Sequence, residues 1–139
     1  NVYFTTLSGG RYQLSRKREG ASRGYSGLDL EIYDAYSGGG RNVDTLSGGE
    51  LFLASLSLAF GLSDVVQSYS GGVRLESIFI DEGFGTLDEE TLNTAMKALF
   101  EIQKSGRTVG IISHVAELKS RIPAQIRILD DHKIKVVLP

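Results

Sequence analysis

Two short apolar runs, each followed at once by residues that can carry chemistry, constrain the fold of this chain most. The first is Ile78-Phe79-Ile80, which ends a strand expected over residues 75–80 and leads into the pair Asp81-Glu82; the second is residues 108–112, which lead into Ser113-His114. Apolar runs of this length predict buried strands. Between them, apolar residues recur at helical spacing and predict one buried helix face: Leu92, Ala95, Met96, Leu99 and Phe100. Strand, helix and strand in this order indicate an α/β layer with parallel strands.

The flanking segments predict antiparallel additions to that layer. Residues 12–16 and 28–33 alternate apolar with polar side chains, as half-buried strands do. The segments 126–129 and 134–137 predict a hairpin, with its turn at Asp130-Asp131. A buried helix is expected from Leu51 over twelve residues, a loop over 37–45, a stop at Gly106 for the amphipathic helix, and a short helix over 115–121. The predicted fold class is α/β, with a central, mainly parallel sheet, helices and flanking antiparallel strands, as one domain over residues 1–139.

Composition narrows the functional classes. The chain has 139 residues, no cysteine, and 15 basic against 17 acidic residues, for a net charge of -2. Disulfide frameworks and cysteine-based zinc sites are therefore excluded. The longest apolar stretch, residues 51–62, falls short of the ~20 residues that a membrane span needs, so we expect no membrane segment and a cytosolic protein. Glycine makes up 17 of the 139 residues, about 12%, against a usual share of about 7%. Parts of the chain are therefore expected to need backbone without a Cβ atom.

The acidic pair Asp81-Glu82 is the first candidate site. In open α/β sheets, ligands bind at the carboxyl ends of the strands. There Asp81 can hold a Mg²⁺ ion while Glu82, pointing the other way, polarises a water molecule, as phosphoryl transfer requires. His114 ends the second apolar strand and could donate a hydrogen bond to a phosphate at the same edge. The alternatives are a solvated acidic pair and an ordinary histidine at a strand end.

The run Leu46-Ser47-Gly48-Gly49-Glu50 directly precedes the apolar helix and is the second candidate site. Ser47 is a good N-cap, and consecutive glycines at a helix start let backbone N–H groups approach an anion where the helix dipole favours negative charge. Other Ser-Gly-Gly runs begin at Ser8, Ser37 and Ser70, so the run alone is not specific. Only the run at Ser47 is followed by Glu and a long helix-forming segment.

A third motif, Gly85-Thr86-Leu87-Asp88, follows the acidic pair closely. Asp88, with Glu89 and Glu90 behind it, also has the pattern of a plain helix N-cap with acidic residues in the first turn. Both interpretations of Asp88 stay open on the residues alone.

In this order and spacing, the motifs resemble the C-terminal half of an ABC-type ATPase head. The resemblance makes residues 46–50 the signature loop, 78–82 the Walker B strand, 85–88 the D-loop and His114 the switch histidine. Within that superfamily, the run 70–88 is very similar to the SbcC family, and its Gly83-Phe84-Gly85 is the sharpest discriminator. Residues 9–12 and 26–30 also match that family, so the resemblance covers essentially the whole chain.

The resemblance implies the C-terminal lobe of a P-loop, SMC-like ABC ATPase head in an ATP-dependent DNA exonuclease and hairpin endonuclease of DNA repair and recombination. Asp81 would position Mg²⁺ through water, Glu82 would be the general base, and His114 would sense the γ-phosphate. The signature residues Ser47, Gly48, Gly49 and Glu50 would bind the ATP held by an opposite head. Within the D-loop of Gly85, Thr86, Leu87 and Asp88, the aspartate would link the two nucleotide sites.

The implied cofactors are ATP and Mg²⁺. The implied partners are the chain's own N-terminal Walker A half, a second head, the SbcD nuclease subunit and double-stranded DNA, with no membrane, in the cytoplasm at the nucleoid. No G-x-x-x-x-G-K-[ST] motif occurs here, so the chain alone should not hydrolyse ATP. Leu51 stands where archaeal and eukaryotic relatives have an arginine that relays nucleotide state, so that relay is not carried over. The rival interpretations are an SMC-type DNA tether and a transporter-type ATPase.

The first 24 residues form a basic end, with five cations against Glu19 alone. Such clustered cations can contact DNA phosphates without reading sequence. The candidate DNA contacts are Arg16, Lys17, Arg18 and Arg23. The alternative is an ordinary solvated hairpin.

Overall fold

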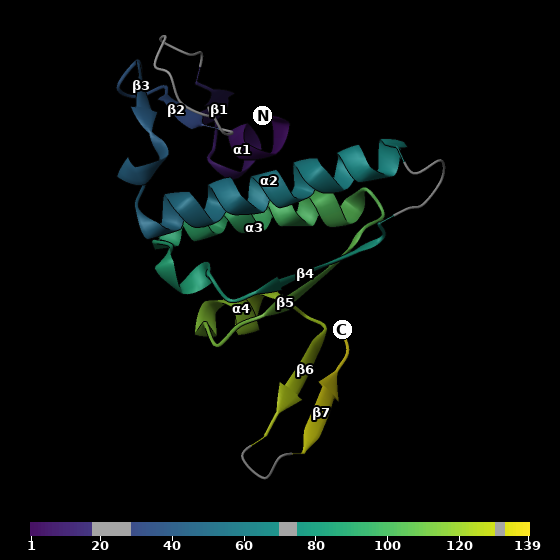
Figure 1. Ribbon diagram of the computed structural model, residues 1–139. Coiled ribbons are helices and arrows are strands. Elements are labelled where there is room, and N and C mark those ends of the chain that lie inside the picture. Colours follow the sequence, from purple (N-terminus) through teal and green to yellow (C-terminus); the bar gives the residue numbers. More distant parts are fainter. Residues whose placement is uncertain (18–28, 70–74, 130–132) are drawn as a thin grey trace.

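The computed structural model describes residues 1–17, 29–69, 75–129 and 133–139 (Figure 1). The helices are α1 (Val2–Leu7), α2 (Gly48–Tyr69), α3 (Glu89–Lys104) and α4 (Ala116–Arg121), with two 3-10 turns, η1 (Val43–Thr45) and η2 (Phe84–Thr86). The strands are β1 (Tyr12–Arg16), β2 (Leu30–Asp34), β3 (Gly39–Asn42), β4 (Ser77–Asp81), β5 (Thr108–Ile112), β6 (Gln125–Ile128) and β7 (Ile134–Val137).

The strand, helix and strand predicted in the second half of the chain are present. Strands β4 and β5 pair in parallel, with Ser77 opposite Thr108 and Asp81 opposite Ile112, and α3 connects them along the chain. Because the two strands are parallel and in this register, both end at the same edge. Glu82 and His114 follow the strands there.

The predicted central sheet is larger than the one observed. Over the described ranges the strands form three separate sheets: antiparallel β1-β2-β3, parallel β4-β5 and antiparallel β6-β7. The parallel sheet has two strands because the sequence supplies one strand-helix-strand unit. Phe79 on β4 is 74% exposed, so one face of this small sheet lacks a cover.

Helix α3 forms where the apolar spacing predicted it. Asp88 is its N-cap, Glu89 and Glu90 occupy its first turn, and Gly106, just past the C-cap, has a φ of 97°, which glycine adopts without steric cost. Four of the five predicted face residues are buried, namely Leu92, Ala95, Met96 and Leu99. The fifth, Phe100, is 38% exposed and lies at the edge of the buried stripe.

Helix α2 is longer than its apolar stretch predicted, with 22 residues. By length and composition it could cross a membrane, and it is the one helix of the described residues that meets this test. Core helices of soluble proteins meet the same test, and α2 buries Leu53, Leu56 and Phe60 in the protein core. The helix is therefore weak evidence for a membrane span, and it is longer than the apolar stretch 51–62 predicts.

The antiparallel sheet extends beyond the predicted pair of strands. β1 and β2 pair as expected, with Leu14 opposite Ile32. The region predicted as a loop contains β3, which pairs with β2, and then η1. β3 escaped prediction because its sequence, Gly-Gly-Arg-Asn, has none of the β-branched or aromatic residues that favour strands.

Helix α1 was not predicted either, and it gives the run Ser8-Gly9-Gly10 a role. Ser8 is the C-cap of α1, and Gly9 and Gly10 both have positive φ. The N–H of Gly10 donates to Thr5 O at 2.7 Å, so the run closes a helix before it leads into β1.

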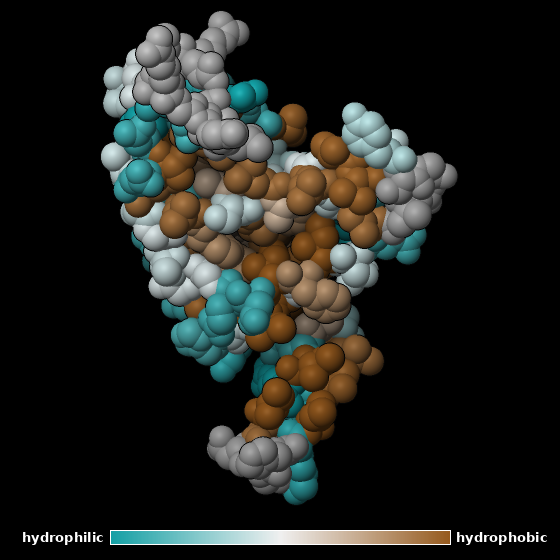
Figure 2. Space-filling model, in the orientation of Figure 1, coloured by the Kyte–Doolittle hydropathy of each residue, from teal (hydrophilic) through white to brown (hydrophobic). Residues whose placement is uncertain are grey.

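One hydrophobic core joins the helices to the sheets. Its most buried large side chains are Phe4, Leu7, Ile32, Leu53, Phe60 and Phe84. The β6-β7 hairpin forms as predicted, except that its turn at Asp130-Asp131 lies outside the described residues. The hairpin extends away from the rest of the molecule (Figure 1) and exposes apolar side chains along its length (Figure 2): Ile126, Ile128, Ile134 and Val136.

Candidate nucleotide site

The carboxyl edge of the β4-β5 sheet brings Glu82 and His114 together. His114 Nδ1 lies 3.0 Å from Glu82 Oε2 and 3.1 Å from Glu82 Oε1. Since a carboxylate has no proton to give, Nδ1–H is the donor in this contact and Nε2 is left for another partner. The side chains of Glu82 and His114 are 49% and 81% exposed, so the pair adds little to stability. Asp81 is exposed beside them.

The backbone of Glu82 is left-handed, with a φ of 61°. Among the described residues, it is the one non-glycine residue with positive φ. Its N–H donates to Ile112 O at 2.9 Å, which ties it to the end of β5. Such a conformation costs of order 1–3 kcal/mol in a residue with a Cβ, and it turns the Glu82 side chain away from the direction that a continued strand would give it.

The motif Gly83-Phe84-Gly85 has a packing explanation. Gly83 has a φ of 97°, and a Cβ there would come within 2.3 Å of the Phe52 ring. Phe84 is 1% exposed, and its ring meets the Phe52 ring edge-on with centroids 5.0 Å apart. The motif therefore fastens the residues after Glu82 to the first turns of α2, whereas a Cβ on Gly85 would meet only an ordinary contact at 3.8 Å.

The signature run forms a capping box at the start of α2. The Ser47 Oγ accepts a hydrogen bond from Glu50 N–H at 3.3 Å, and Glu50 Oε2 accepts one from Ser47 N–H at 2.8 Å. The pattern Ser-x-x-Glu is a sequence signal for this geometry. Ser47 and Gly48 are exposed, and the Ser47 hydroxyl hydrogen remains available to a further acceptor.

Gly49 is buried, which differs from the expectation that it approaches an anion. A Cβ at Gly49 would lie 3.0 Å from Thr86 O and 3.1 Å from Leu87 Cδ2. The glycine therefore lets the start of α2 press against the D-loop. The structure thus brings the signature run and the D-loop into direct contact.

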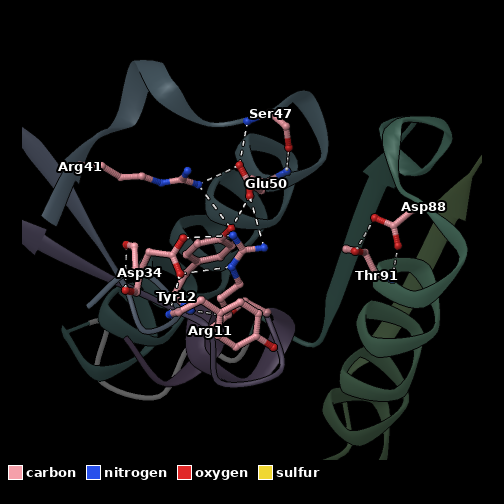
Figure 3. Close-up of polar contacts among 11 residues, drawn as sticks. Arg11, Tyr12, Asp34, Arg41, Ser47, Glu50, Asp88 and Thr91 are labelled. Atoms are coloured by element: carbon pink, nitrogen blue, oxygen red, sulfur yellow. Dashed lines mark hydrogen bonds and ion pairs between the residues drawn. The ribbon is translucent and has the colours of Figure 1, made fainter. Parts of the chain in front are cut away.

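Glu50 has partners that the sequence did not reveal. Arg41 on β3 donates to Glu50 Oε2 at 2.9 Å, Tyr12 on β1 donates to Oε1, and the Arg11 guanidinium lies 3.9 Å from Oε1 (Figure 3). Burial raises the pKa of Glu50, but the hydrogen bonds from Tyr12 and Ser47 and the charge of Arg41 outweigh it and hold that pKa below its usual value. Glu50 is therefore a charged group fixed from several sides.

Asp88 is an N-cap in this structure, as one of its two interpretations expected. Its Oδ1 accepts from Thr91 N–H at 2.9 Å and its Oδ2 from the Thr91 hydroxyl at 2.8 Å (Figure 3). These hydrogen bonds, the one from the Thr91 backbone first, lower the pKa of the Asp88 carboxyl. Asp88 is exposed, so the capping role leaves it accessible.

Two of the four candidate DNA contacts lie in the described residues. Arg16 at the end of β1 and Lys17 after it are both exposed, whereas Arg18 and Arg23 lie outside the described ranges. Exposure of Arg16 and Lys17 is compatible with a phosphate contact and equally with a solvated hairpin.

The carboxyl edge suits Mg²⁺ bound together with a nucleotide. Mg²⁺ usually takes one or two carboxylates and completes its shell with water and substrate phosphates. Asp81 offers one exposed carboxylate at the strand end. Within the described ranges, no three acidic or imidazole side chains converge as an all-protein metal cage would require. The donor set therefore fits a Mg²⁺ ion that shares its coordination with phosphate.

Solved structures define the class of the fold. The chain matches an SMC ATPase from work on the ATP-driven dimerization and DNA-stimulated activation of SMC ATPases, with a TM-score of 0.69 and 20% identity over 98% of this chain and 78% of that chain. It also matches the SMC head domain from Thermotoga maritima, with a TM-score of 0.61 and 16% identity over 100% of this chain and 45% of that chain. The mixed α/β fold is that of SMC ATPase heads.

Sequence comparison identifies the family within that class. The SbcC/RAD50-like, Walker B motif family model matches residues 21–101, and the chain belongs to this family. The SbcC component of the nuclease SbcCD from Staphylococcus haemolyticus (strain JCSC1435) is 61% identical over 123 residues, which are 88% of this chain. The chain spans 12% of that relative's length. The resemblance drawn from the motifs is thus confirmed, while the roles of individual residues stay predictions.

Proposed function

We propose that this chain is the Walker B and signature part of an ATPase head in an SbcC-type component of a DNA nuclease. The observation that carries the proposal is the juxtaposition at one sheet edge of a left-handed Glu82, after β4, with His114, after β5, at 3.0 Å. The family match and the SMC head fold support it.

At the carboxyl edge, the side chains divide the work of phosphoryl transfer. A bound Mg²⁺ would neutralise phosphate charge, and Asp81 is the residue that would hold it, through water. Glu82 takes the proton of the attacking water as general base. His114 donates two hydrogen bonds when both of its ring nitrogens carry a proton: one from Nδ1–H to Glu82 and one from Nε2–H to the γ-phosphate.

At the start of α2, the signature run serves the nucleotide of a second head. Ser47 donates its free hydroxyl hydrogen, and the exposed Gly48 adds a backbone N–H at the positive end of the helix dipole. The D-loop touches this turn through Thr86 and Leu87, and this contact supports a role for Asp88 in connecting the two nucleotide sites. ATP then joins two heads, and hydrolysis releases them.

The remaining partners follow from the surface and the family. The chain's own Walker A half would supply the missing phosphate loop and cover the open face of the β4-β5 sheet, where Phe79 and Ile112 are exposed. The nuclease chemistry would belong to an SbcD-type partner acting on double-stranded DNA. The assembly would work in the cytoplasm, at the nucleoid.

Replacing Glu82 by Gln in the full-length protein tests the proposal. The amide keeps the shape of the side chain but cannot accept the proton of water, so ATP should still bind while turnover falls about 10²- to 10⁴-fold. Glu76→Gln is the matched control, because Glu76 is exposed just before the other end of β4. Turnover of Glu82→Gln within a few-fold of the parent protein would refute the role of Glu82.

The basic end makes a separate claim about DNA. If Arg16, Lys17 and Arg18 contact phosphates, replacing them with Ala should weaken binding to all sequences alike. It should also flatten the salt dependence by roughly 0.9 in the log-log slope per lost contact. ATP hydrolysis without DNA should barely change. An unchanged slope, measured by titration at several salt concentrations, would leave this hairpin as solvated surface.

A further inference from the structure

Helix α2 is held to the rest of the domain by two similar polar clusters, in each of which an acid of the helix binds a tyrosine and an arginine; the first also includes Arg11, 3.9 Å from the acid. In the first, Glu50 binds Tyr12 and Arg41. In the second, Asp64 accepts from the Tyr3 hydroxyl at 2.7 Å and pairs with Arg107. The two acids are fourteen residues apart, so about 21 Å of helix separates the clusters.

Only the first cluster touches the signature run. Glu50 accepts a hydrogen bond from Ser47 N–H and another from Arg41. The same carboxylate therefore closes the capping box and binds the antiparallel sheet. Arg41 lies on β3 and Tyr12 on β1, so two strands of the sheet converge on this point (Figure 3).

Tyr12 is the buried centre of the first cluster and fixes its geometry. The residue is 3% exposed, and the guanidinium groups of Arg11 and Arg41 lie over its ring at 4.6 and 5.3 Å from the centroid. Its hydroxyl donates to Glu50 and accepts from Arg41 at 3.3 Å. Burial and the hydrogen bond to Glu50 raise the pKa of Tyr12, so the phenol keeps its proton and remains a donor at neutral pH.

We propose that Tyr12 and Arg41 are positioning residues for the signature run. They hold Glu50 so that Ser47 and the first N–H groups of α2 stand ready for the phosphate of a second head. The inference rests on the proposed function of the signature run. It adds that the antiparallel sheet, outside the nucleotide site itself, sets the geometry on which head association depends.

The second cluster supplies the matched control that this inference needs. Arg107 pairs with Asp64, an acid of the same helix. The side chain of Arg107 is 16% exposed, compared with 29% for that of Arg41. If Arg41 served stability alone, the loss of either arginine would have the same kind of effect. If Arg41 positions the signature run, only its loss should move head association.

The experiment compares Arg41→Gln with Arg107→Gln in the full-length protein, with ATP as the probe. Three quantities are measured: ATP affinity of dilute, unassociated heads, the ATP concentration that gives half-maximal head association, and the midpoint of thermal unfolding. For Arg41→Gln we expect half-maximal association at ATP concentrations at least ten-fold higher, with ATP affinity of single heads within two-fold. For Arg107→Gln we expect association within two-fold of the parent protein, at a comparable loss of thermal stability.

Smaller changes keep the test informative if Arg41→Gln folds poorly. Tyr12→Phe removes only the hydroxyl that Glu50 accepts from, and Tyr3→Phe is its counterpart in the second cluster. Tyr12→Phe should shift association and Tyr3→Phe should not. Arg41→Lys should recover part of the association lost in Arg41→Gln, because an ammonium can still pair with Glu50.

Failure of the inference differs from failure of the proposed function. Ser47→Arg, measured in parallel, should abolish association if the signature run meets the second head's nucleotide. If Ser47→Arg abolishes association but Arg41→Gln and Arg107→Gln shift it equally or not at all, the positioning role is wrong and the signature role stands. If Ser47→Arg leaves association intact, the function proposed for the run is wrong, and the inference falls with it.

Discussion

The start of α2 and the carboxyl edge of the β4-β5 sheet are held in opposite ways. Glu50, at the helix start, has its side chain 20% exposed and is bound by Ser47, Tyr12 and Arg41. The side chain of Glu82, at the strand edge, is 49% exposed, and its polar partner there is His114, whose side chain is itself 81% exposed. One acid is fixed before any ligand arrives, whereas the other is free to turn toward a ligand.

This contrast indicates that the helix start has its geometry before a nucleotide binds, whereas the strand edge acquires its geometry on binding. A fixed donor array at a helix start can recognise a phosphate as it stands, because capping and ion pairs have already set its geometry. An exposed base with an exposed partner acquires its working geometry when nucleotide, Mg²⁺ and water surround it. Phe52, packed on Phe84 at 5.0 Å between centroids, links the two halves.

The largest effect is expected from Ser47→Arg in the full-length protein, which attacks the fixed half directly. A bulky cation at the exposed helix start should block the second head, so ATP-induced association should vanish together with hydrolysis. ATP affinity of single heads should survive. Light scattering measures the association, and equilibrium binding measures the affinity.

Ser8→Arg is the control for that change. Ser8 begins the same tripeptide, but it stands at the C-terminal end of α1, where the helix presents carbonyl groups. Association should therefore persist in Ser8→Arg. If Ser8→Arg abolished association and Ser47→Arg did not, the signature run would be misassigned.

The link between the two halves should be breakable at Gly83 by a single methyl group. In Gly83→Ala, the positive φ and the overlap with the Phe52 ring should together lower the free energy of unfolding by about 2–4 kcal/mol. Gly85→Ala should cost much less, because its Cβ meets only a 3.8 Å contact and its φ is not positive. Denaturant unfolding of the two full-length variants would compare them, and equal losses would exclude the packing explanation.

The smallest effect is expected in the pH dependence of stability, where the fixed acid Glu50 should leave a trace. The folded pKa of Glu50 lies below its usual value of about 4.3, so its stabilising contribution is complete above that value. The contribution disappears as the pH falls through the folded pKa. Glu50→Gln should flatten the loss of stability that the parent protein shows below pH ~4.3 by less than about 1 kcal/mol, as expected for one partly exposed ion-pair group. Unfolding midpoints across that range test it, and a steeper profile in Glu50→Gln would contradict the assignment.

Local patterns in the sequence predicted the elements of the site. The apolar runs placed β4 and β5, and their parallel pairing put Glu82 and His114 at one edge. The N-caps at Ser47 and Asp88 were also predictable, since capping involves residues three positions apart. These features depend on short-range periodicity and on hydrogen bonds within one turn.

Features that depend on distant contacts were not predictable. Tyr12 and Glu50 are 38 residues apart in the chain, and no periodicity connects them. The buried position of Gly49 depends on Thr86 and Leu87, which reach it only after the chain has folded back. Ser8 and Ser47 begin identical tripeptides at opposite ends of helices, so the residues around a run, rather than the run itself, decide its place.

The left-handed backbone of Glu82 sets selection for folding stability against selection for catalysis at one position. Glycine would adopt a φ of 61° without steric cost, and asparagine tolerates it better than glutamate does. In a library varied at this codon and selected only for folded, abundant protein, Gly and Asn should therefore rise at the expense of Glu. A library selected for survival that depends on the complete assembly should keep Glu. The ratio of the two enrichments would report, at a single codon, how much conformational cost the organism accepts for chemistry.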